Sequence, residues 1–408
     1  MSTRWSIASL ERSTSAAESA LHVNGGIESE LTSGARRRGM DAPTAEALLA
    51  GAVRHRSPSG EEGAVARHLV ESMRPWADAS EVDGVGNSVG WFGSGALRVA
   101  LLGHLDTVPG WWPVRVEAGV LHGRGSVDAK GSLCAMIAAA TRLSAATLER
   151  VSVQVIGAVG EEAGSEGARH ATRAYPKPDL VVVGEPSGWD ALTLGYKGRL
   201  TLRVEIERDE GHGARDEPTA AARAALAWSV VESWARSHEV ASAGLFHAVQ
   251  ASLTSIGSTS DGLHQRAHAS IGLRLPPALD PRDAEDALRA LVAPRLGSDT
   301  VRLDFGNHER AYLGPRDGAL TRAFRAAIRA EGAQPRHLLK TGTSDMNVVA
   351  PVWDVPMVAY GPGDASLDHT PHERLELAEY ARSIRVLERV LASVASGVRR
   401  PTGRSSSG

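Results

Sequence analysis

The stretch "LLGHLDTVPG", residues 101–110, joins the end of an apolar run to two polar side chains. The run predicts a buried strand over Val99–Leu102, and His104 and Asp106 follow it at a spacing of two residues. Side chains two residues apart in an extended chain point to the same side. The stretch therefore predicts that an imidazole and a carboxylate face one point where a strand ends.

Three more apolar runs, dense in Val and Leu, predict further strands of the same sheet: Val151–Val159, Leu180–Val183 and Pro356–Tyr360. Continuous apolar runs are typical of strands that have helices on both faces, and Ala-rich helical segments alternate with these runs. This order predicts an α/β fold with a mixed, mostly parallel sheet flanked by helices. We expect residues 41–192 and 304–398 to form this larger domain.

Residues 193–303 follow a different pattern. Their strand-like segments alternate apolar and polar residues, as in "LTLGYKGRLTLRVEIERD" (192–209), and two helical segments interrupt them. The order is roughly βαββαβ, which predicts a complete small α+β domain inserted into the larger one. The ends of the chain, residues 1–40 and 399–408, are rich in Ser, Gly and Arg and are expected to be disordered extensions.

The composition narrows the class of protein. A chain of 408 residues predicts two domains, and a formal net charge of −3 gives no general attraction to nucleic acid or to anionic membranes. We find neither an apolar run long enough to span a membrane nor a signal peptide, so a cytoplasmic location is expected. The single cysteine, Cys134, excludes a disulfide within the chain and a cysteine-rich zinc site.

Polar groups recur at the ends of the predicted strands, and in open α/β sheets ligands bind beyond the carboxyl ends of the strands. Alone, a His-x-Asp or Glu-Glu pair is more often a local hydrogen-bonding or solvated group; the repetition favours one shared site. Packed together, five carboxylates would repel one another unless cations neutralise them. Nitrogen and oxygen ligands suit zinc, cobalt or manganese, and their number fits two ions. The candidate residues are His104, Asp106, Asp128, Glu161, Glu162, Glu185 and His369.

The motifs "GHLDTVPG", "LHGRGSVDAKGSLCAMIAA", "VGEEAGSEGA", "VVGEPSG" and "DHTPHERL" resemble, in order and spacing, a known metallohydrolase family. This is the family of dinuclear zinc aminoacylases and carboxypeptidase-G-type enzymes, which includes acetylornithine deacetylase and succinyl-diaminopimelate desuccinylase. The resemblance covers about residues 45–395. It implies two divalent ions, Zn²⁺ or Co²⁺, and a homodimer in which the inserted domain is a ferredoxin-like lid and dimerisation domain.

The resemblance also implies a role for each residue. Asp128 would bridge the two ions, His104 and Glu185 would complete one site, and Glu162 and His369 the other. Asp106 would orient the imidazole of His104. Glu161 would take a proton from the attacking water and pass it to the leaving amine. His212 would reach the active site of the partner subunit and stabilise the oxyanion.

Finer features concern the substrate. "GEPSGWDALTLGYKGRL", "KTGTSDMNVVAP" and "GSVDAKG" resemble the lysine and ornithine hydrolases of the amino-group-carrier pathway. Those enzymes release the amino acid from the γ-carboxyl of the C-terminal glutamate of a small acidic carrier protein. Asp345 would hold a cationic amine or, alternatively, cap a helix. The residues expected to bind substrate are Arg274, Lys340, Thr341, Gly342, Thr343, Ser344, Asp345 and Lys197.

Three alternatives stay open from the sequence. The first is a small-molecule deacylase, such as acetylornithine deacetylase or succinyl-diaminopimelate desuccinylase. The second is a dipeptidase or carboxypeptidase. The third is a binding protein of the same fold that has lost its metals, but the complete set of ligand types argues against it.

Overall fold

The computed structural model of the protein describes residues 39–212, 216–238, 244–297 and 300–397. The extensions predicted at the two ends, residues 1–40 and 399–408, lie outside these ranges, with the exception of residues 39 and 40. Met40 was expected in the N-terminal extension, yet it is 2% exposed and packs in the core. Its backbone N–H donates to Thr141 Oγ1, and Arg142 Nε donates to its carbonyl.

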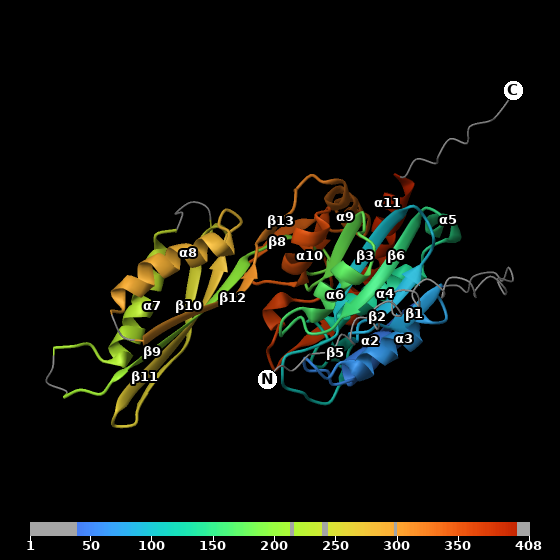
Figure 1. Ribbon diagram of the computed structural model, residues 1–408. Helices are drawn as coiled ribbons and strands as arrows, with labels where there is room; N and C mark the ends of the chain where they lie inside the picture. Colours follow the sequence, from blue (N-terminus) through green and yellow to red (C-terminus); the bar gives the residue numbers. More distant parts are fainter. Residues whose placement is uncertain (1–38, 213–215, 239–243, 298–299, 398–408) are drawn as a thin grey trace, which may run out of the picture. The chain divides into compact units, whose positions relative to one another are not determined.

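In the described part of the chain, the main sheet has nine strands in the order β1-β2-β6-β3-β7-β15-β8-β13, with β14 beside β8 (Figure 1). The central strands β6, β3, β7 and β15 are parallel, and antiparallel neighbours flank them. The strands are β1 (Ala79–Val82), β2 (Ser88–Phe92), β3 (Leu97–His104), β6 (Val151–Ala158), β7 (Leu180–Gly184), β8 (Ala191–Tyr196), β13 (Tyr312–Leu313), β14 (Arg336–Lys340) and β15 (Met357–Ala359).

Helices cover both faces of this sheet, which explains the continuous apolar runs. Val99 and Leu101 of β3 join one buried cluster, while Ala100 and Leu102 join another on the opposite face. The first cluster includes α2 (Ala42–Arg54), α3 (Gly63–Met73), α4 (Lys130–Thr141), α9 (Ala319–Ala330) and α11 (Leu377–Ser396). The second includes α6 (Glu166–Ala174) and α10 (Asp345–Trp353). Among the described helices, none combines the length and the apolar character needed to cross a membrane.

Shorter elements complete this domain. They are α5 (Ala145–Leu148), the short helix η4 (Ala365–Leu367), and a sheet of β4 (Arg115–Glu117), β5 (Val120–His122) and β16 (Arg374–Glu376) in the order β16-β5-β4.

A second, antiparallel sheet has the order β10-β11-β9-β12. Its strands are β9 (Gly198–Asp209), β10 (Gln250–Ser260), β11 (His264–Leu275) and β12 (Thr300–Glu309), and its helices are α7 (Ala220–Arg236) and α8 (Pro281–Val292), with the short helices η2 (Leu245–His247) and η3 (Ala293–Arg295). Alternate residues of β9, from Leu200 to Ile206, pack under α7 and α8, while the residues between them face the other way. The chain order and the strand order are those of a ferredoxin-like α+β unit.

The two boundaries expected for this unit, 193 and 303, both lie inside strands. Residue 193 belongs to β8 of the main sheet, and 303 belongs to β12 of the second sheet. The sheets instead divide the chain at about Lys197 and Arg310. The pattern "LTLGYKGRLTLRVEIERD" could not reveal the first division, because one strand follows another with a single residue between them.

Asn347, in helix α10, contacts both segments in which the chain passes from one sheet to the other. Its side-chain N–H groups donate to the carbonyls of Lys197 (3.0 Å) and Arg310 (2.7 Å). Its side-chain oxygen accepts from the N–H of Ser344 (2.9 Å), which closes a capping box at the start of α10. One buried amide therefore holds the two links between the sheets against the segment that precedes α10.

Candidate metal centre and active site

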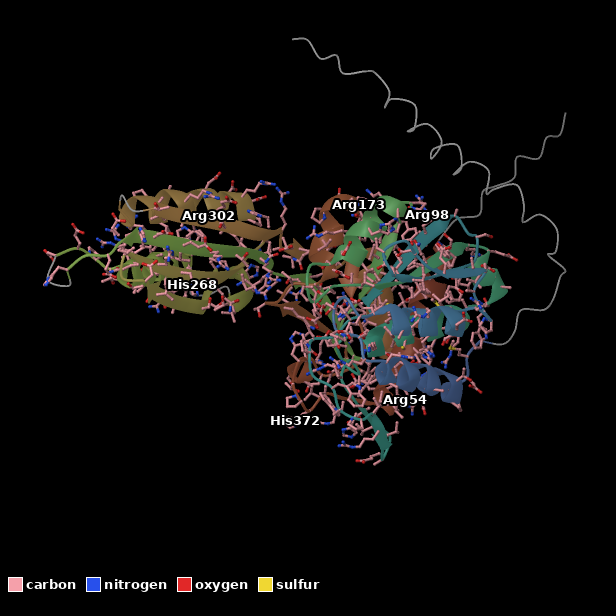
Figure 2. The ribbon with its side chains drawn as sticks, turned by 60° about the horizontal axis from the view of Figure 1, so that its bottom comes forward. Arg54, Arg98, Arg173, His268, Arg302 and His372 are labelled. Atoms are coloured by element: carbon pink, nitrogen blue, oxygen red, sulfur yellow. The ribbon has the colours of Figure 1, made fainter. Side chains whose placement is uncertain are left out.

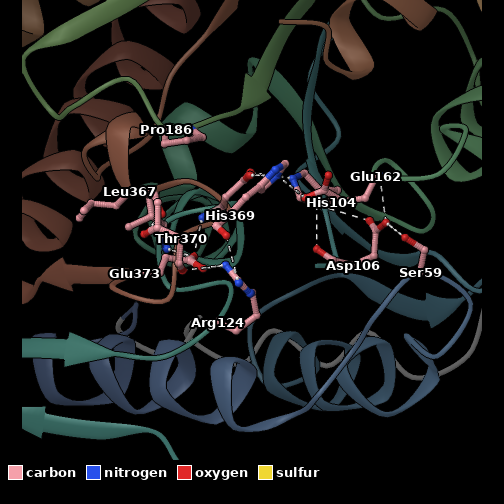
Figure 3. Close-up of polar contacts among 12 residues, drawn as sticks. Ser59, His104, Asp106, Arg124, Glu162, Pro186, Leu367, His369, Thr370 and Glu373 are labelled. Atoms are coloured by element: carbon pink, nitrogen blue, oxygen red, sulfur yellow. Dashed lines mark hydrogen bonds and ion pairs between the residues drawn. The ribbon is translucent and has the colours of Figure 1, made fainter. Parts of the chain in front are cut away.

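The site begins where β3 ends. His104 is 1% exposed, and its Nδ1 lies 3.0 Å from the carbonyl oxygen and 3.4 Å from the carboxylate of Asp106. The Asp106 carboxylate also accepts the hydroxyl of Ser59 (2.6 Å), as Figure 3 shows. Burial alone would raise the pKa of Asp106, but the contacts with His104 and Ser59 hold this pKa below its usual value. Asp106 thus stays ionised and directs the other ring nitrogen of His104, Nε2, into the site.

The turn after β6 carries the paired glutamates. Gly160 has a φ of +73°, a left-handed conformation that favours glycine. This turn aims the N–H groups of Glu161 and Glu162 at the Asp106 carboxylate, at 3.0 Å each. One carboxylate therefore joins the end of β3 to the end of β6. Figure 3 includes the contact with Glu162.

Asp128 lies between two imidazoles. Its Oδ1 is 3.2 Å from His104 Nε2, and its Oδ2 is 3.0 Å from His369 Nε2. Glu162 Oε1 is also 3.0 Å from His369 Nε2. Burial opposes the charge of Asp128, but the hydrogen bonds from the two histidines hold its pKa well below the ordinary value. The peptide bond between Asp128 and Ala129 is cis.

These donors fit a dinuclear metal centre. One ligand atom each from Asp128, Glu162 and His369 lies within 4.8 Å of the others. The two oxygens of Asp128 face different imidazoles, as a carboxylate shared by two cations would. Glu161 and Glu185 line the same pocket, and burial raises the pKa of both; that of Glu185 reaches about 8. The donors are carboxylate oxygens and imidazole nitrogens, the ligand types of catalytic zinc sites.

A buried ion pair holds the loops that carry Asp128 and His369. Arg124 donates to Glu373 Oε2 (2.8 Å) and to the carbonyls of His369 (3.3 Å) and Thr370 (3.2 Å). Glu373 Oε1 accepts the N–H groups of Val127 (2.9 Å) and Asp128 (3.0 Å). Figure 3 shows this arrangement below His369. His369 has a φ of +63°, a conformation that costs a non-glycine residue about 1–3 kcal/mol. The Arg124–Glu373 pair stabilises that backbone and fixes the distance between Asp128 and His369.

A pocket of about 480 Å³ opens beside these ligands. Arg274, from β11, enters it and donates to Thr343 Oγ1 at 2.9 Å. Lys340 Nζ donates to the carbonyl of Pro186 at 2.6 Å. Of the residues expected from the sequence, the pocket wall contains Asp128, Glu161, Glu162, Glu185, His369, Arg274, Lys340, Thr341, Gly342 and Thr343.

Three residues expected to bind substrate are not on this wall. Lys197 is 0% exposed; its Nζ donates to the carbonyls of Leu245 and Ala248 and to the side chain of Gln250, so it anchors the segment before β10. Ser344 is the N-cap of α10, and its hydroxyl accepts the N–H of Met346. Asp345 is 2% exposed as the first residue of α10, so it neither lines the pocket nor caps the helix.

His212 does not line the pocket of its own chain. It is exposed and lies beyond Asp209, the last residue of β9, whereas Arg199 at the start of β9 lines the pocket. The 12 residues of β9 extend for about 40 Å at roughly 3.3 Å per residue. The role expected for His212 therefore needs a second copy of the chain, and it stays a prediction. His372, which the same C-terminal motif contains, is also exposed (Figure 2).

The pocket also contains residues that were not expected. Asp368 precedes His369 directly, and burial beside Asp128 raises its pKa to about 8. Tyr196 and Arg199 flank Lys197 in the chain, and both line the pocket. All three residues belong to motifs quoted above, "GYKGR" and "DHTPHERL", and this was the sequence signal that could have indicated them. It does not say which side chain of a motif turns toward the pocket.

The chain is similar in sequence to known hydrolases. Residues 100–393 match the model of peptidase family M20/M25/M40. The chain is 53% identical over 362 residues to a [LysW]-lysine hydrolase of Deinococcus radiodurans, which covers 88% of this chain and 99% of that protein. It is 26% identical over 283 residues to a [LysW]-lysine/[LysW]-ornithine hydrolase of Sulfurisphaera tokodaii, covering 69% of this chain and 77% of that protein.

The fold is also that of a solved structure. A dinuclear metal-binding peptidase of the M20 family from Bacillus subtilis superposes with a TM-score of 0.64. The match covers 88% of this chain and 100% of the other, at 12% sequence identity. At this identity the likeness concerns the fold alone.

We expect Glu373→Gln to weaken the binding of the first Zn²⁺ by about 10- to 100-fold, because the loops of Asp128 and His369 lose their common anchor. Calorimetric titration of the metal-free protein measures this affinity, and thermal unfolding shows whether the variant is folded. Glu376→Gln, an exposed position on β16, is the matched control. Equal zinc affinity in a folded Glu373→Gln variant would contradict the positioning role.

The metal-free protein should become less stable as the pH rises from about 5.5 to about 8.5. Burial raises the pKa of Glu185 and Asp368 to about 8, so between their ordinary values and about 8 the folded chain keeps protons that the unfolded chain has lost. The pKa of His369 is raised from 6.5 to about 9, mainly by its bond to Asp128, so its stabilising effect is complete below about 6.5 and is lost as the pH rises to about 9. Melting temperatures with chelator should fall across this range, and bound divalent ions should reduce the fall. A metal-free protein that melts at a constant or rising temperature would refute this.

Proposed function

The chain belongs to peptidase family M20/M25/M40, and we propose that it releases lysine or ornithine from an amino-group carrier protein. The bond cleaved would be the amide between the α-amine of the released amino acid and the γ-carboxyl of the carrier's C-terminal glutamate. The observation that carries this proposal is the 53% identity to a [LysW]-lysine hydrolase over 99% of that protein's length. The pocket contains the acidic side chains and the cationic side chains that such a hydrolysis would use.

We infer that the centre holds two divalent ions, Zn²⁺ or alternatively Co²⁺. Asp128 would be shared, with His104 and Glu185 at one ion and Glu162 and His369 at the other. Bound ions of this kind polarise an amide carbonyl and lower the pKa of water. The arrangement of Asp128 between the two imidazoles, at 3.2 and 3.0 Å, supports this assignment.

Glu161 is the proposed general base and acid. It lines the pocket, and burial together with the nearby charge of Glu185 raises its pKa well above the ordinary value of 4.5. A carboxyl group with a raised pKa holds and returns a proton more readily near neutral pH. Glu161 would accept a proton as the oxygen of water attacks the carbonyl carbon. It would return that proton to the nitrogen as the carbon–nitrogen bond breaks, leaving the free amino acid and the γ-carboxylate of the carrier.

Two carboxylates flank the scissile bond of this substrate, one on the released amino acid and one on the glutamate. The pocket presents matching groups: the guanidinium of Arg274, the ammonium of Lys340 and the hydroxyls of Thr341 and Thr343. Arginine binds a carboxylate through two parallel hydrogen bonds. These groups would hold the two carboxylates so that the amide between them lies against Glu161.

We further infer a homodimer formed through the second sheet and its helices. His212 lies beyond the far end of β9 from the pocket, so only a partner subunit could bring it to the reacting carbonyl. A cytoplasmic location would agree with a biosynthetic role for the reaction. Both statements are parts of the proposal.

A small-molecule deacylase is the second candidate. A volume of about 480 Å³ also suits an N-acyl amino acid, and the same Arg274 and Lys340 would bind its carboxylate. Acetylornithine and succinyl-diaminopimelate are the substrates of this alternative.

The metal-loaded enzyme should hydrolyse carrier-γ-lysine or carrier-γ-ornithine at least about 100 times more efficiently than N-acetylornithine or succinyl-diaminopimelate. Glu161→Gln should lose about 10²- to 10⁴-fold in kcat while keeping its metal content. Glu166→Gln, exposed at the start of α6, is the matched control and should stay within about twofold of the parent. Amino acid release followed by mass spectrometry measures each rate. Turnover of only the small acyl compounds would reject the carrier substrate.

A further inference from the structure

The amino acid that the proposed reaction releases brings a positive charge into the pocket. Lysine and ornithine each have a side-chain amine with an ordinary pKa of about 10, so this amine is an ammonium at neutral pH. An ammonium that leaves water without a partner is costly, and a carboxylate is the group that offsets this cost. The cations on the pocket wall, Arg199, Arg274 and Lys340, would instead repel it. A pocket for such a substrate therefore needs an acidic side chain that faces it.

Among the described residues, five carboxyl groups line the pocket. The proposed metal centre and proton transfer use four of them, namely Asp128, Glu161, Glu162 and Glu185. The fifth is Asp368. Asp345, which the sequence suggested for a cationic amine, is 2% exposed and is not on the pocket wall. Asp368 is thus the carboxylate of the pocket that the reaction leaves unused.

Asp368 lacks a hydrogen-bonded cation in the described part of the chain. Its Oδ1 is buried and accepts no hydrogen bond there. The charge of Lys340 acts on Asp368, but the ammonium of Lys340 donates to the carbonyl of Pro186 at 2.6 Å. Burial, and after it the charge of Asp128, raises the pKa of Asp368 to about 8. A buried carboxyl group in this state is stabilised as a carboxylate when a cation approaches it.

The loop that carries Asp368 is held in place by its own backbone. The N–H of Thr370 (3.1 Å) and its hydroxyl (2.8 Å) both donate to the carbonyl of Leu367, and Figure 3 shows both residues. The N–H of Asp368 donates to the carbonyl of Ala365 at 3.3 Å. Ala365 and Leu339 also line the pocket and give it an apolar wall. Such a wall suits the methylene groups of a lysine or ornithine side chain.

We propose that Asp368 determines the specificity for the released amino acid, with its carboxylate binding the side-chain ammonium of lysine or ornithine. This inference rests on the proposed function and deepens it. Arg274 and Lys340 remain the groups that bind the carboxylates beside the scissile amide, and Asp368 contacts the far end of the released residue. A side chain that ends in a methyl group leaves the carboxylate of Asp368 without its partner and is rejected.

The test compares carrier-γ-lysine with carrier-γ-norleucine, because norleucine is lysine without its ammonium. The parent should prefer the lysine substrate by at least about 30-fold in kcat/KM. Asp368→Asn should reduce this preference to less than about fivefold, because the amide keeps the shape of the side chain and loses its charge. Its kcat/KM for the norleucine substrate should stay within about threefold of the parent, and its metal content should not change.

Asp368→Glu keeps the charge and reaches one methylene group farther. It should retain the preference for lysine over norleucine. It should also raise the ratio of ornithine to lysine release by about threefold or more, because ornithine is one methylene group shorter. Calorimetric titration of the metal-loaded protein with the free amino acids gives a second readout. The parent should bind lysine at least about tenfold more tightly than norleucine, and Asp368→Asn should bind the two about equally.

Asp286→Asn, exposed on α8 and not on the pocket wall, removes the same charge and is the matched control. It should stay within about twofold of the parent with both substrates. Melting temperatures identify any variant that is misfolded. If the parent releases lysine from the carrier but does not prefer it to norleucine, the assignment of Asp368 is wrong. It is equally wrong if a folded Asp368→Asn keeps the full preference or loses a metal ion. If the parent hydrolyses neither carrier-γ-lysine nor carrier-γ-ornithine, the proposed function itself fails, and this inference fails with it.

Discussion

The carboxylate of Asp128, held between the imidazoles of His104 and His369, is the contact on which the rest of the site depends. Each oxygen faces a different ring, so the residue joins the strand end at His104 to a loop near the end of the chain. Glu161, Glu162, Glu185 and Asp368 crowd around this point, and burial raises the pKa of all four. A cluster of this kind is costly for the empty protein. It becomes favourable when divalent cations are bound.

Two buried carboxylates outside the pocket wall maintain that geometry. Asp106 holds the ring of His104 and the N–H groups of Glu161 and Glu162, which ties β3 to the turn after β6. Glu373 holds Arg124 and the N–H groups of Val127 and Asp128, which ties Asp128 to the loop of His369. Each of these groups satisfies several buried donors, and so the candidate ligands are held in position by the chain itself.

The strand ends were the part of the site that the sequence could predict. His104, Asp128, Glu161, Glu162, Glu185 and His369 follow apolar runs or glycine-rich turns, and parallel strands bring their ends to one edge of the sheet. Lys197, Ser344 and Asp345 are not on the pocket wall, because a motif does not show which side chains turn toward a cavity and which support the backbone. Arg124 and Glu373 lie 249 positions apart in the chain, so their contact could come only from the fold. The division between β8 and β9 could not be predicted either. The two strands belong to different sheets, but they are so close in the chain that their sequence pattern is that of a single strand.

Crystals of the protein grown with Zn²⁺ and measured at the zinc absorption edge test the central claim most directly. The anomalous difference map should show two peaks per chain, one on each side of the Asp128 carboxylate, with His104 beside one and His369 beside the other. A single peak, or two peaks that do not share Asp128, would contradict the dinuclear centre.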